Sequence, residues 1–435
     1  MARTFHIVTF GCRTNQADSG ALREEFLSRG YREQVEPRAD VVVVNSCTVT
    51  QRSDQQVRQM VRRLRRSNPG AKLIVTGCYA QRDPEALSNI EGVDAVVGNS
   101  HKSEIVSIAA KKSIDPLGVS EVTRVFRDPF DLSLRTDRGA VAKGRQRTRP
   151  FVKVQDGCDA HCTYCIIPEV RGPSRSVPPD QLVEQVRDLT RKGFQEIVLT
   201  GIHIGTYGRY MDPPLTFHSL LKKLLEIERL QRLRISSIEP MELSRKVIHL
   251  VAASEGRIAP HFHICLQSGC DQILKRMLRP YKTARFRSLI EEIREVLPEA
   301  GIGTDVIGGF PGESDQDHQD SLEFVKQMPL TYIHVFPYSD RPGTVASTMD
   351  DKVDGVTVRH RCAQFRTISE SKNLEFRTRQ LGRKVPALTL SDFWRGQRVA
   401  LTDNYLKALV DPKIPGNKLV RLRARVGPEG YLSLT

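Results

Sequence analysis

The sequence predicts a multidomain α/β protein that ends in a small all-β domain. Strand patterns alternate with amphipathic helix patterns in two separate runs, a basic segment without apolar periodicity lies between the runs, and short alternating strands follow the second run. A chain of 435 residues is long enough for two or three domains. We expect four segments, with bounds 1–125, 126–149, 150–382 and 383–435.

The first run predicts a doubly wound parallel sheet. Its strand patterns are continuous stretches rich in Val and Ile, and helix patterns separate them. Such strands are typical of a parallel sheet that helices bury on both faces. The expected strands are 5–10, 41–45, 72–77 and 93–98, and the expected helices include 17–29 and 52–66.

The second run predicts an open barrel of six β–α units. Helix patterns such as 179–193, 216–230 and 314–328 separate its strand patterns. Six units are fewer than the eight of a closed (β/α) barrel, so we expect a partial barrel with functional residues at its strand ends. The expected strands are 151–155, 196–201, 232–238, 262–267, 303–309 and 332–338.

The charge of the chain indicates a polyanionic partner. The formal net charge is +15, which favours nucleic acid, with a basic protein that binds none as the alternative. Residues 135–149 hold six basic residues against one acidic residue and predict a linker or a basic arm. From residue 383 onward there are ten Lys and Arg against four Asp and Glu, and alternation places Arg421, Arg423 and Arg425 on one face of a strand. We therefore expect a small β-barrel that binds RNA.

The sequence shows no membrane or secretion signal. No apolar run approaches the ~20 residues that cross a bilayer, and the first residues lack the apolar core of a signal peptide. We expect a cytoplasmic, monomeric protein that contacts no membrane. In a reducing compartment the nine cysteines are better metal-ligand or catalytic candidates than disulfide partners.

Three cysteines lie close together directly after the first strand of the second run. Cys158, Cys162 and Cys165 stand in GCDAHCTYC, with gaps of three and two residues. Thiolates suit iron–sulfur clusters and zinc, but a structural zinc site takes a fourth ligand, and none follows at a suitable distance. A cluster on three cysteines keeps one iron open for a substrate. We therefore expect a reactive iron–sulfur centre.

Three further cysteines each follow a predicted strand of the first run. Cys12, Cys47 and Cys78 lie 35 and 31 residues apart, in FGC, NSC and TGC. One βαβ unit takes ~30 residues or more, so this spacing brings all three thiols to the carboxyl edge of one sheet. We expect a second cluster with three protein ligands. Cys265, Cys270 and Cys362 receive no role.

The motif GCDAHCTYC resembles the radical S-adenosylmethionine superfamily, and the whole chain resembles the methylthiotransferase family within it. The similarity rests on FGCRTNQ, NSCTVT, GCYAQ, GCDAHCTYCIIPEVRG, RISSIEP, HICLQSG and FPYSDRPGT. TGIHIGTYG and TDNY indicate the MtaB type, which acts on N6-threonylcarbamoyladenosine at position 37 of tRNA. The resemblance implies a C-terminal domain of the TRAM type.

The resemblance also implies two [4Fe-4S] clusters and two roles for S-adenosylmethionine. At Cys158, Cys162 and Cys165 the cofactor yields a 5′-deoxyadenosyl radical, which abstracts hydrogen from adenine C2. At Cys12, Cys47 and Cys78 it methylates sulfur, which the carbon radical then captures. The partners are the tRNA anticodon loop, an electron donor such as flavodoxin or ferredoxin, and an unidentified sulfur donor.

Further residues in these motifs are candidates for contact with the cofactor. Tyr164 matches the position that packs near its adenine, and the others stand at predicted strand ends or in DVIGGFPGE, where each has a structural cap as its alternative role. The set is Tyr164, Glu239, Gln267, Asp305, Gly309 and Glu313. His203 either contacts the modified base or has a structural role. Arg58, Arg62, Arg63, Arg65, Arg66 and the arm 135–149 either line an RNA-binding rim or form solvated faces.

Three alternatives remain open from the sequence. The same chemistry can act on isopentenyladenosine in tRNA or on an aspartate of a ribosomal protein. An RNA-binding iron–sulfur electron-transfer protein is a more distant alternative, for which clusters with four ligands are expected.

Overall fold

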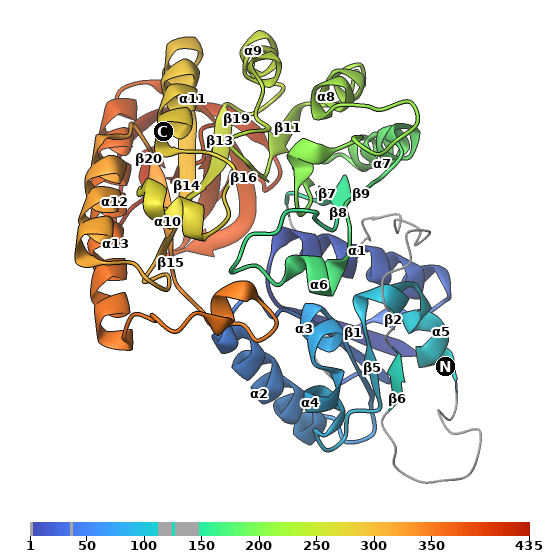
Figure 1. Cartoon of the computed structure of the whole chain (residues 1–435). Helices are drawn as coiled ribbons and strands as arrows, with labels where there is room; N and C mark the ends of the chain where they lie inside the picture. Colours follow the sequence, from blue (N-terminus) through green and yellow to red (C-terminus); the bar gives the residue numbers. More distant parts are fainter. Residues whose placement is uncertain (1–2, 35–37, 112–123, 127–147) are drawn as a thin grey trace.

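The computed structural model describes residues 3–34, 38–111, 124–126 and 148–435. An N-terminal sheet, a central α/β region and a C-terminal β-barrel follow one another along the chain (Figure 1). The predicted α/β class is confirmed. Most of the predicted linker 126–149, namely residues 127–147, lies outside the described residues.

The N-terminal domain is built on six parallel strands. Their order in the sheet is β2-β1-β3-β4-β5-β6, and every neighbouring pair is parallel. All six residues of β3 are buried, as the continuous Val pattern predicted. The strands are β1 (Thr4–Thr9), β2 (Arg32–Glu33), β3 (Val41–Ser46), β4 (Lys72–Gly77), β5 (Ala95–Val97) and β6 (Arg124–Phe126).

Helices cover both faces of this sheet. Val41 and Val43 pack with Leu22 of α1, whereas Val42 and Val44 pack with residues of α2 and α3. The strand order reverses between β1 and β3, the kind of position where doubly wound sheets bind ligands. The helices are α1 (Arg13–Ser28), α2 (Gln51–Ser67), α3 (Cys78–Arg82), α4 (Pro84–Ser88), η1 (Asn99–Glu104) and α5 (Ile105–Ala110).

The central region contains all six predicted strands, divided between two sheets. The predicted strand 232–238 forms β11 and β12, with a break at Ser236. A three-stranded sheet has the order β11-β10-β7, and a four-stranded sheet has the order β12-β13-β14-β15. The strands are β7 (Phe151–Lys153), β10 (Glu196–Thr200), β11 (Arg232–Ile235), β12 (Ser237–Ile238), β13 (His261–Gln267), β14 (Gly301–Gly308) and β15 (Tyr332–Pro337), beside a small antiparallel pair β8 (Gln155–Asp156) and β9 (Arg175–Ser176).

Helices pack against one face of these sheets and form the main apolar core. Alternate residues such as Ile264 on β13 and Ile302 on β14 pack with Leu289 of α11 and Val325 of α12. The helices, in chain order, are α6 (Ile167–Arg171), α7 (Pro179–Arg191), α8 (Phe217–Leu225), α9 (Arg245–Ala253), α10 (Asp271–Arg276), α11 (Thr283–Val296) and α12 (Asp315–Gln327), with 3-10 turns η2 (Ile204–Thr206) and η3 (Val345–Thr348). The opposite face carries polar side chains.

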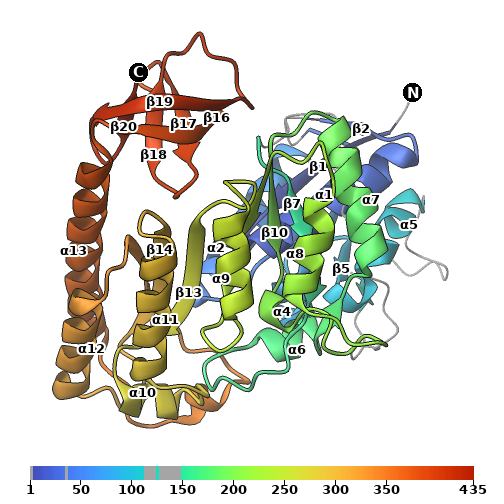
Figure 2. The same cartoon turned by 90° about the horizontal axis from the view of Figure 1, so that it is seen from above.

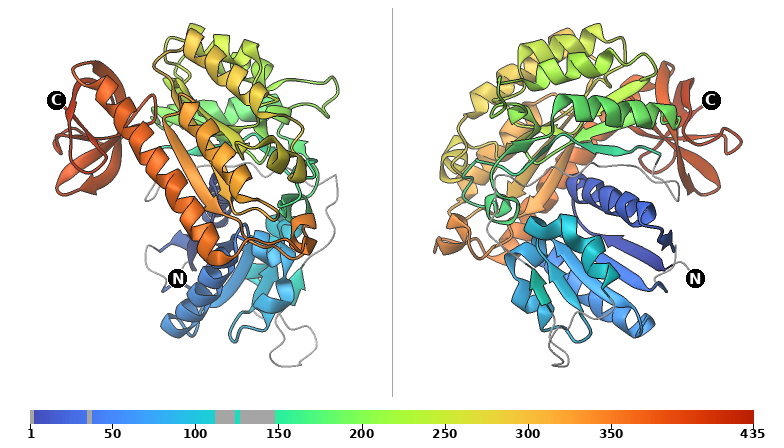
Figure 3. Two further views of the ribbon diagram at one scale, coloured as in Figure 1. Left: turned by 60° about the vertical axis from the view of Figure 1, so that its left-hand side comes forward. Right: turned by 90° about the vertical axis from the view of Figure 1, so that its right-hand side faces the viewer.

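A long helix, α13 (Gly355–Gln380), connects the central region to the C-terminal domain, as Figures 2 and 3 show. The domain is a closed barrel of five strands in the order β16-β17-β18-β20-β19. These strands are β16 (Lys384–Trp394), β17 (Gln397–Thr402), β18 (Lys407–Val410), β19 (Leu419–Val426) and β20 (Leu432–Leu434). Within the described ranges, no helix is long and apolar enough to cross a bilayer.

Candidate functional site

The first cysteine triad lies at the carboxyl edge of the N-terminal sheet. Cys12 precedes α1 directly after β1, Cys47 follows β3, and Cys78 begins α3 directly after β4. Because β1, β3 and β4 are adjacent parallel strands, their ends meet at one edge. The structure therefore brings together the three residues that the strand spacing predicted.

Close packing around Cys47 explains the glycine before Cys12. Gly11 has φ +92°, and a Cβ atom on it would lie 2.8 Å from the Sγ of Cys47. Only glycine fits both this backbone conformation and this approach. The Gly–Cys pair thus allows the end of β1 to lie against the second thiol.

The first triad has the electrostatics of a metal-ligand set. Burial, with a smaller contribution from the charges of Cys78 and Cys12, raises the pKa of Cys47 to about 12. A buried thiol of this kind is stable as a thiolate only beside a cationic centre, since a bound metal deprotonates its thiol ligands. The residues of this triad therefore fit a metal cluster.

The second triad lies in the loop between β8 and α6. Gly157 precedes Cys158 with φ +73°, and a Cβ atom there would lie 1.9 Å from the carbonyl oxygen of Pro173. Burial raises the pKa of Cys165 to about 12, and the charges of Cys162 and Cys158 contribute in the same direction. These thiols also fit a cluster.

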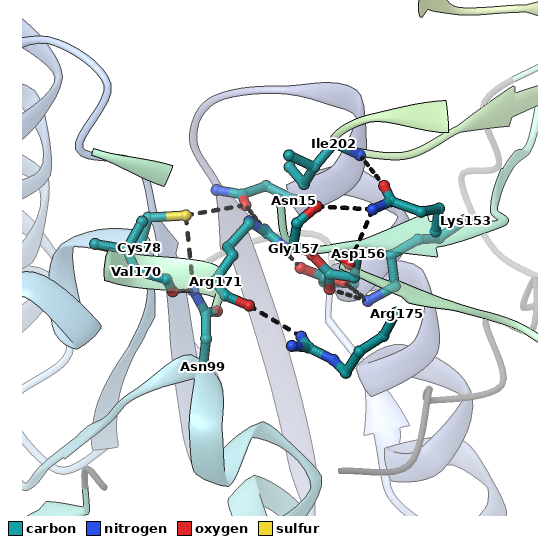
Figure 4. A network of polar contacts seen from close by, with 12 residues as sticks. Asn15, Cys78, Asn99, Lys153, Asp156, Gly157, Val170, Arg171, Arg175 and Ile202 are labelled. Atoms are coloured by element: carbon teal, nitrogen blue, oxygen red, sulfur yellow. Dashed lines mark hydrogen bonds and ion pairs between the residues drawn. The ribbon is translucent and has the colours of Figure 1, made fainter. Parts of the chain in front are cut away.

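The two triads approach each other across the boundary between the domains. Cys78 packs against Ile166 and Val170, which follow Cys165 in the chain. The side-chain amide of Asn99 donates to the Sγ of Cys78 at 3.7 Å and to the carbonyl of Val170 at 2.8 Å (Figure 4). Cys78 of the first triad is therefore held against α6, the helix that follows the second triad in the chain.

A buried polar network fixes this boundary (Figure 4). The guanidinium of Arg171 donates to Asp156 at 2.8 Å, to Asp18 at 3.0 Å and to Asn15 at 2.5 Å. Lys153 donates to both carboxylates, at 2.6 Å to Asp18 and 2.9 Å to Asp156. Burial alone raises the pKa of Asp18, but the cations outweigh it and lower the pKa well below the usual value. The network joins α1 to the strand and helix that flank the second triad.

Arg279 was not predicted from the sequence and lies beside the second triad. Its guanidinium donates to the Sγ of Cys162 at 3.3 Å and forms an ion pair with Glu239. Glu239, a predicted cofactor contact, is thereby held near a thiol. Tyr164, the second such residue, packs edge-on against Phe310 with ring centroids 6.5 Å apart.

The remaining predicted cofactor contacts are more dispersed. Glu313 is buried, and its carboxylate accepts from the backbone N–H of Gly309 and from Arg361, both at 2.7 Å. Asp305 pairs with two histidines on neighbouring strands. Gln267 ends β13 with φ 69°.

His203 lies against the second triad. Its Nδ1 is 3.5 Å from the Sγ of Cys158, and its Nε2 contacts the carboxylate of Glu242. Burial lowers the pKa of His203, but both partners outweigh burial and raise the pKa to about 10. In the structure, the imidazole ring of His203 therefore contacts both Cys158 and Glu242.

The three predicted RNA-binding arginines alternate along one strand, as the sequence pattern indicated. Arg421, Arg423 and Arg425 are exposed along β19. On α2, by contrast, Arg65 is engaged by Asp94 and by the carbonyl of Gly92. The basic arm 135–149 lies outside the described residues except for its last two.

Comparisons with known proteins cover nearly the whole chain. Residues 4–98 match the family described as "Uncharacterized protein family UPF0004", and residues 152–325 match the Radical SAM superfamily. The protein of Aquifex aeolicus (strain VF5) named "Threonylcarbamoyladenosine tRNA methylthiotransferase MtaB" is 39% identical over 96% of this chain and 98% of its own length.

Two further proteins show the range of this similarity. A "tRNA-2-methylthio-N(6)-dimethylallyladenosine synthase" of Parafrankia sp. (strain EAN1pec) is 34% identical over 88% of this chain and 77% of its own length. The structure of the radical S-adenosylmethionine methyltransferase TsrM from Kitasatospora setae, with cobalamin and a [4Fe-4S] cluster bound, has a TM-score of 0.58 at 14% identity, covering 80% of this chain and 77% of that one. This structural likeness concerns the fold alone.

Proposed function

Because this chain belongs to the radical S-adenosylmethionine methylthiotransferases of the MtaB type, we propose that it adds a methylthio group to C2 of N6-threonylcarbamoyladenosine at position 37 of tRNA. The observation that carries this proposal is the approach of two cysteine triads across one domain boundary, with Cys78 packed on the helix after Cys165. A sulfur insertion needs a radical source and a sulfur site within reach of one base.

Each triad is assigned one [4Fe-4S] cluster. Cys158, Cys162 and Cys165 would hold one, and Cys12, Cys47 and Cys78 would hold the other. When bound, the two clusters supply the electron that cleaves S-adenosylmethionine and the site at which sulfur is methylated. The placement of Cys12, Cys47 and Cys78 at one sheet edge, and of Cys158, Cys162 and Cys165 in one loop, supports a metal cluster in both places.

The chain's own residues orient these sites. Arg279 donates to Cys162 and holds Glu239 beside it, so that this carboxylate is available to the amino group of the cofactor. Tyr164 and Phe310 provide an apolar surface for its adenine. Gln267 at the end of β13 and Gly309 directly after β14 are assigned to the same site, with Glu313 as the residue that fixes the backbone of Gly309 and Asp305 within β14 as a further polar contact.

The domains divide this work. We assign the N-terminal domain, 1–125, to sulfur, the partial barrel, 150–382, to radical formation, and the TRAM-like barrel, 383–435, to tRNA. The arginines of β19 support the last assignment because they are exposed on one strand. A flavodoxin or ferredoxin would supply electrons to the monomeric enzyme.

A triple substitution tests the division between the triads. In the Cys12→Ala, Cys47→Ala, Cys78→Ala variant, anaerobic reconstitution should give half of the wild-type iron, retained formation of 5′-deoxyadenosine and no methylthiolated nucleoside. Cys362→Ala, which removes a buried cysteine of α13, is the control and should keep all three properties. Full iron content in the triple variant, or loss of 5′-deoxyadenosine, would contradict the division.

Nucleoside mass spectrometry tests the substrate. Transfer RNA from cells that lack this gene should contain threonylcarbamoyladenosine without its 2-methylthio derivative, and the gene should restore the derivative. The same chemistry on dimethylallyladenosine is the alternative, which the Parafrankia relative supports. Loss of the methylthio group from that nucleoside instead would favour the alternative.

A further inference from the structure

A row of polar side chains occupies the face of the four-stranded sheet that the helices leave uncovered. His261 and His263 alternate on β13, Asp305 lies on β14, and Tyr332 and His334 alternate on β15. In the strand register Asp305 lies directly opposite His334. We call these residues the polar face.

His263, Asp305 and His334, three members of the polar face, form a compact cluster of side chains. Nε2 of His263 lies 2.9 Å from Oδ1 of Asp305, and Nδ1 of His334 lies 3.4 Å from the same oxygen. Their ligand atoms all lie within 4.8 Å of one another. The side chain of His263 is 8% exposed, that of Asp305 19% and that of His334 50%. The cluster is therefore buried at one side and open at His334, whose Nε2 has no hydrogen-bond partner in the described part of the chain.

Contacts connect this cluster to the second cysteine triad. Cys265 stands two residues after His263 on β13, and its backbone carbonyl accepts from Arg279 at 3.3 Å. Arg279 in turn donates to the Sγ of Cys162. Burial raises the pKa of the Cys265 thiol well above its usual value, and the charges of Glu239 and Asp305 contribute in the same direction.

Contacts on the other side lead to the first triad. The hydroxyl of Tyr332 lies 2.8 Å from His261 and 3.1 Å from His263. The ring of Tyr405, from the C-terminal barrel, stacks on His261 with centroids 4.2 Å apart. Its hydroxyl accepts from Arg13 at 2.8 Å, and Arg13 directly follows Cys12. Contacts of the polar face thus lead to Arg279 beside the second triad and to Arg13 beside the first.

We propose that His334, supported by Asp305 and His263, recognises the polar N6 substituent of the adenosine and thereby selects threonylcarbamoyladenosine over dimethylallyladenosine. This inference rests on the proposed function. A threonylcarbamoyl group carries urea N–H groups and a hydroxyl, which can donate to the carboxylate of Asp305, and a carboxylate, which can accept from a ring N–H of His334. A dimethylallyl group is a branched hydrocarbon that would cover these polar groups without pairing them.

The expected preference for the threonylcarbamoyl RNA over the dimethylallyl RNA depends on the cost of leaving polar groups of the site without hydrogen bonds. A site built to hydrogen-bond a substrate can reject an analogue that lacks the bonds by about 10⁴-fold, whereas an apolar pocket separates similar groups only weakly. Phe336, two residues further along β15 and 43% exposed, adds an aromatic surface next to His334, with ring centroids 6.5 Å apart. A base or its substituent can pack there.

The test compares two anticodon stem-loop RNAs that differ only in the nucleoside at position 37, one with threonylcarbamoyladenosine and one with dimethylallyladenosine. The reconstituted full-length enzyme is assayed for kcat/KM of methylthiolation on each RNA, and for 5′-deoxyadenosine without RNA. The variants are His334→Phe, which keeps a ring without its nitrogens, and His334→Gln, which keeps a donor. His249→Phe, on the exposed side of α9, is the matched control.

For His334→Phe we expect kcat/KM on the threonylcarbamoyl RNA to fall about 10²-fold, and on the dimethylallyl RNA to change less than about threefold. His334→Gln should keep part of the selectivity. Unchanged iron content and 5′-deoxyadenosine formation will show that the fold and the radical site persist.

Two results would overturn the inference alone. The wild-type enzyme would in both cases prefer the threonylcarbamoyl RNA. In the first, His334→Phe lowers kcat/KM equally on both RNAs; in the second, it changes kcat/KM on neither. Each result would show that His334 does not select the substrate. A wild-type enzyme that prefers the dimethylallyl RNA, or acts on neither, would overturn the proposed function and this inference together.

Discussion

Arg171 and Asp18 form a buried ion pair of 3.0 Å between a helix of the central region and the first helix of the N-terminal domain. Both side chains are almost inaccessible, with exposures of 2% and 1%. Asp18 lies on the helix that follows Cys12 and Arg171 on the helix that follows Cys165, so the pair connects the elements that carry the two triads. Asp156 and Asn15 complete the shell of acceptors around the same guanidinium.

The first prediction concerns Arg171→Met. The substitution leaves Asp156 and Asp18 with lysines alone, and a buried pair that loses one partner costs about 3–5 kcal/mol. The free energy of unfolding, measured by urea titration, should fall by that amount. Arg187→Met is the control, because Arg187 and its partner Glu184 are about half exposed and such pairs contribute about 0.5 kcal/mol. Equal effects of the two substitutions would show that the network does not hold the boundary.

The second prediction concerns Tyr405. Tyr405→Phe removes the hydrogen bond to Arg13 and should lower the free energy of unfolding by about 1 kcal/mol. Tyr405→Ala also removes the stack on His261 and should cost about 3 kcal/mol or more. Tyr210→Ala, at a tyrosine that is 66% exposed, should change it by less than about 0.5 kcal/mol. A Tyr405→Ala value no larger than that of Tyr210→Ala would contradict the role of this contact.

The third prediction concerns pH and Glu196. Burial alone raises the pKa of this carboxyl, but Arg234, Arg149 and Arg232 outweigh burial and lower the pKa to about 2. Since the folded pKa lies below the ordinary value of 4.5, the stabilisation is fully present above that pH and is lost as the pH falls toward 2. At about 1.4 kcal/mol per pKa unit, the complete loss is about 3 kcal/mol.

Urea unfolding of the cluster-free protein from about pH 5.5 down to about pH 3 measures this effect. Glu196→Gln lacks the titrating group, so its free energy of unfolding should fall less steeply over the same interval. Parallel curves for the two proteins would show that Glu196 does not account for acid sensitivity. The guanidinium of Arg234, which bonds both Glu196 and the carbonyl of Asp403, makes the C-terminal barrel part of the unit that loses stability.

The fourth prediction concerns Arg421, Arg423 and Arg425. If these arginines contact phosphates, their joint replacement by Ala should weaken tRNA binding and reduce the slope of log K against log salt by about 2–3. Fluorescence anisotropy over a potassium chloride series gives both quantities. Arg187→Ala with Arg191→Ala removes two exposed arginines of α7 and should leave the slope unchanged. An unchanged slope in the triple variant would place the tRNA elsewhere.

The cysteine triads could be predicted from sequence because their placement follows from strand order. Parallel neighbouring strands end at one edge, so three cysteines one βαβ unit apart must converge. The strand pattern itself was strong: residues 72–77 form β4 with the predicted bounds, and the six strands of the central region all form. The break at Ser236 was not predicted, although two consecutive serines, Ser236 and Ser237, interrupt the apolar pattern there.

The partners of the triads could not be predicted in the same way. Arg279 lies 117 positions from Cys162, and Arg171 lies 156 positions from Asn15. No local periodicity relates such residues, and an arginine in sequence does not show which carboxylate it will meet. Glu313 is a similar case: its motif indicated a cofactor contact, which stays a prediction, but the motif did not indicate that Arg361 on α13 would pair with its carboxylate. Tyr405 stood in a recognised motif, TDNY, whose contacts only the fold discloses.

Because the ribosome synthesises the chain from its N-terminus, the contact between Arg13 and Tyr405 forms late. Arg13 and Tyr405 are 392 positions apart, so this hydrogen bond forms only after residue 405 has been synthesised. Domains fold largely as they emerge, and the N-terminal sheet is therefore assembled long before its last neighbour exists. A chain truncated before residue 405 would keep both triads but lack this hydrogen bond, so the contact couples the C-terminal barrel to the helix that follows Cys12.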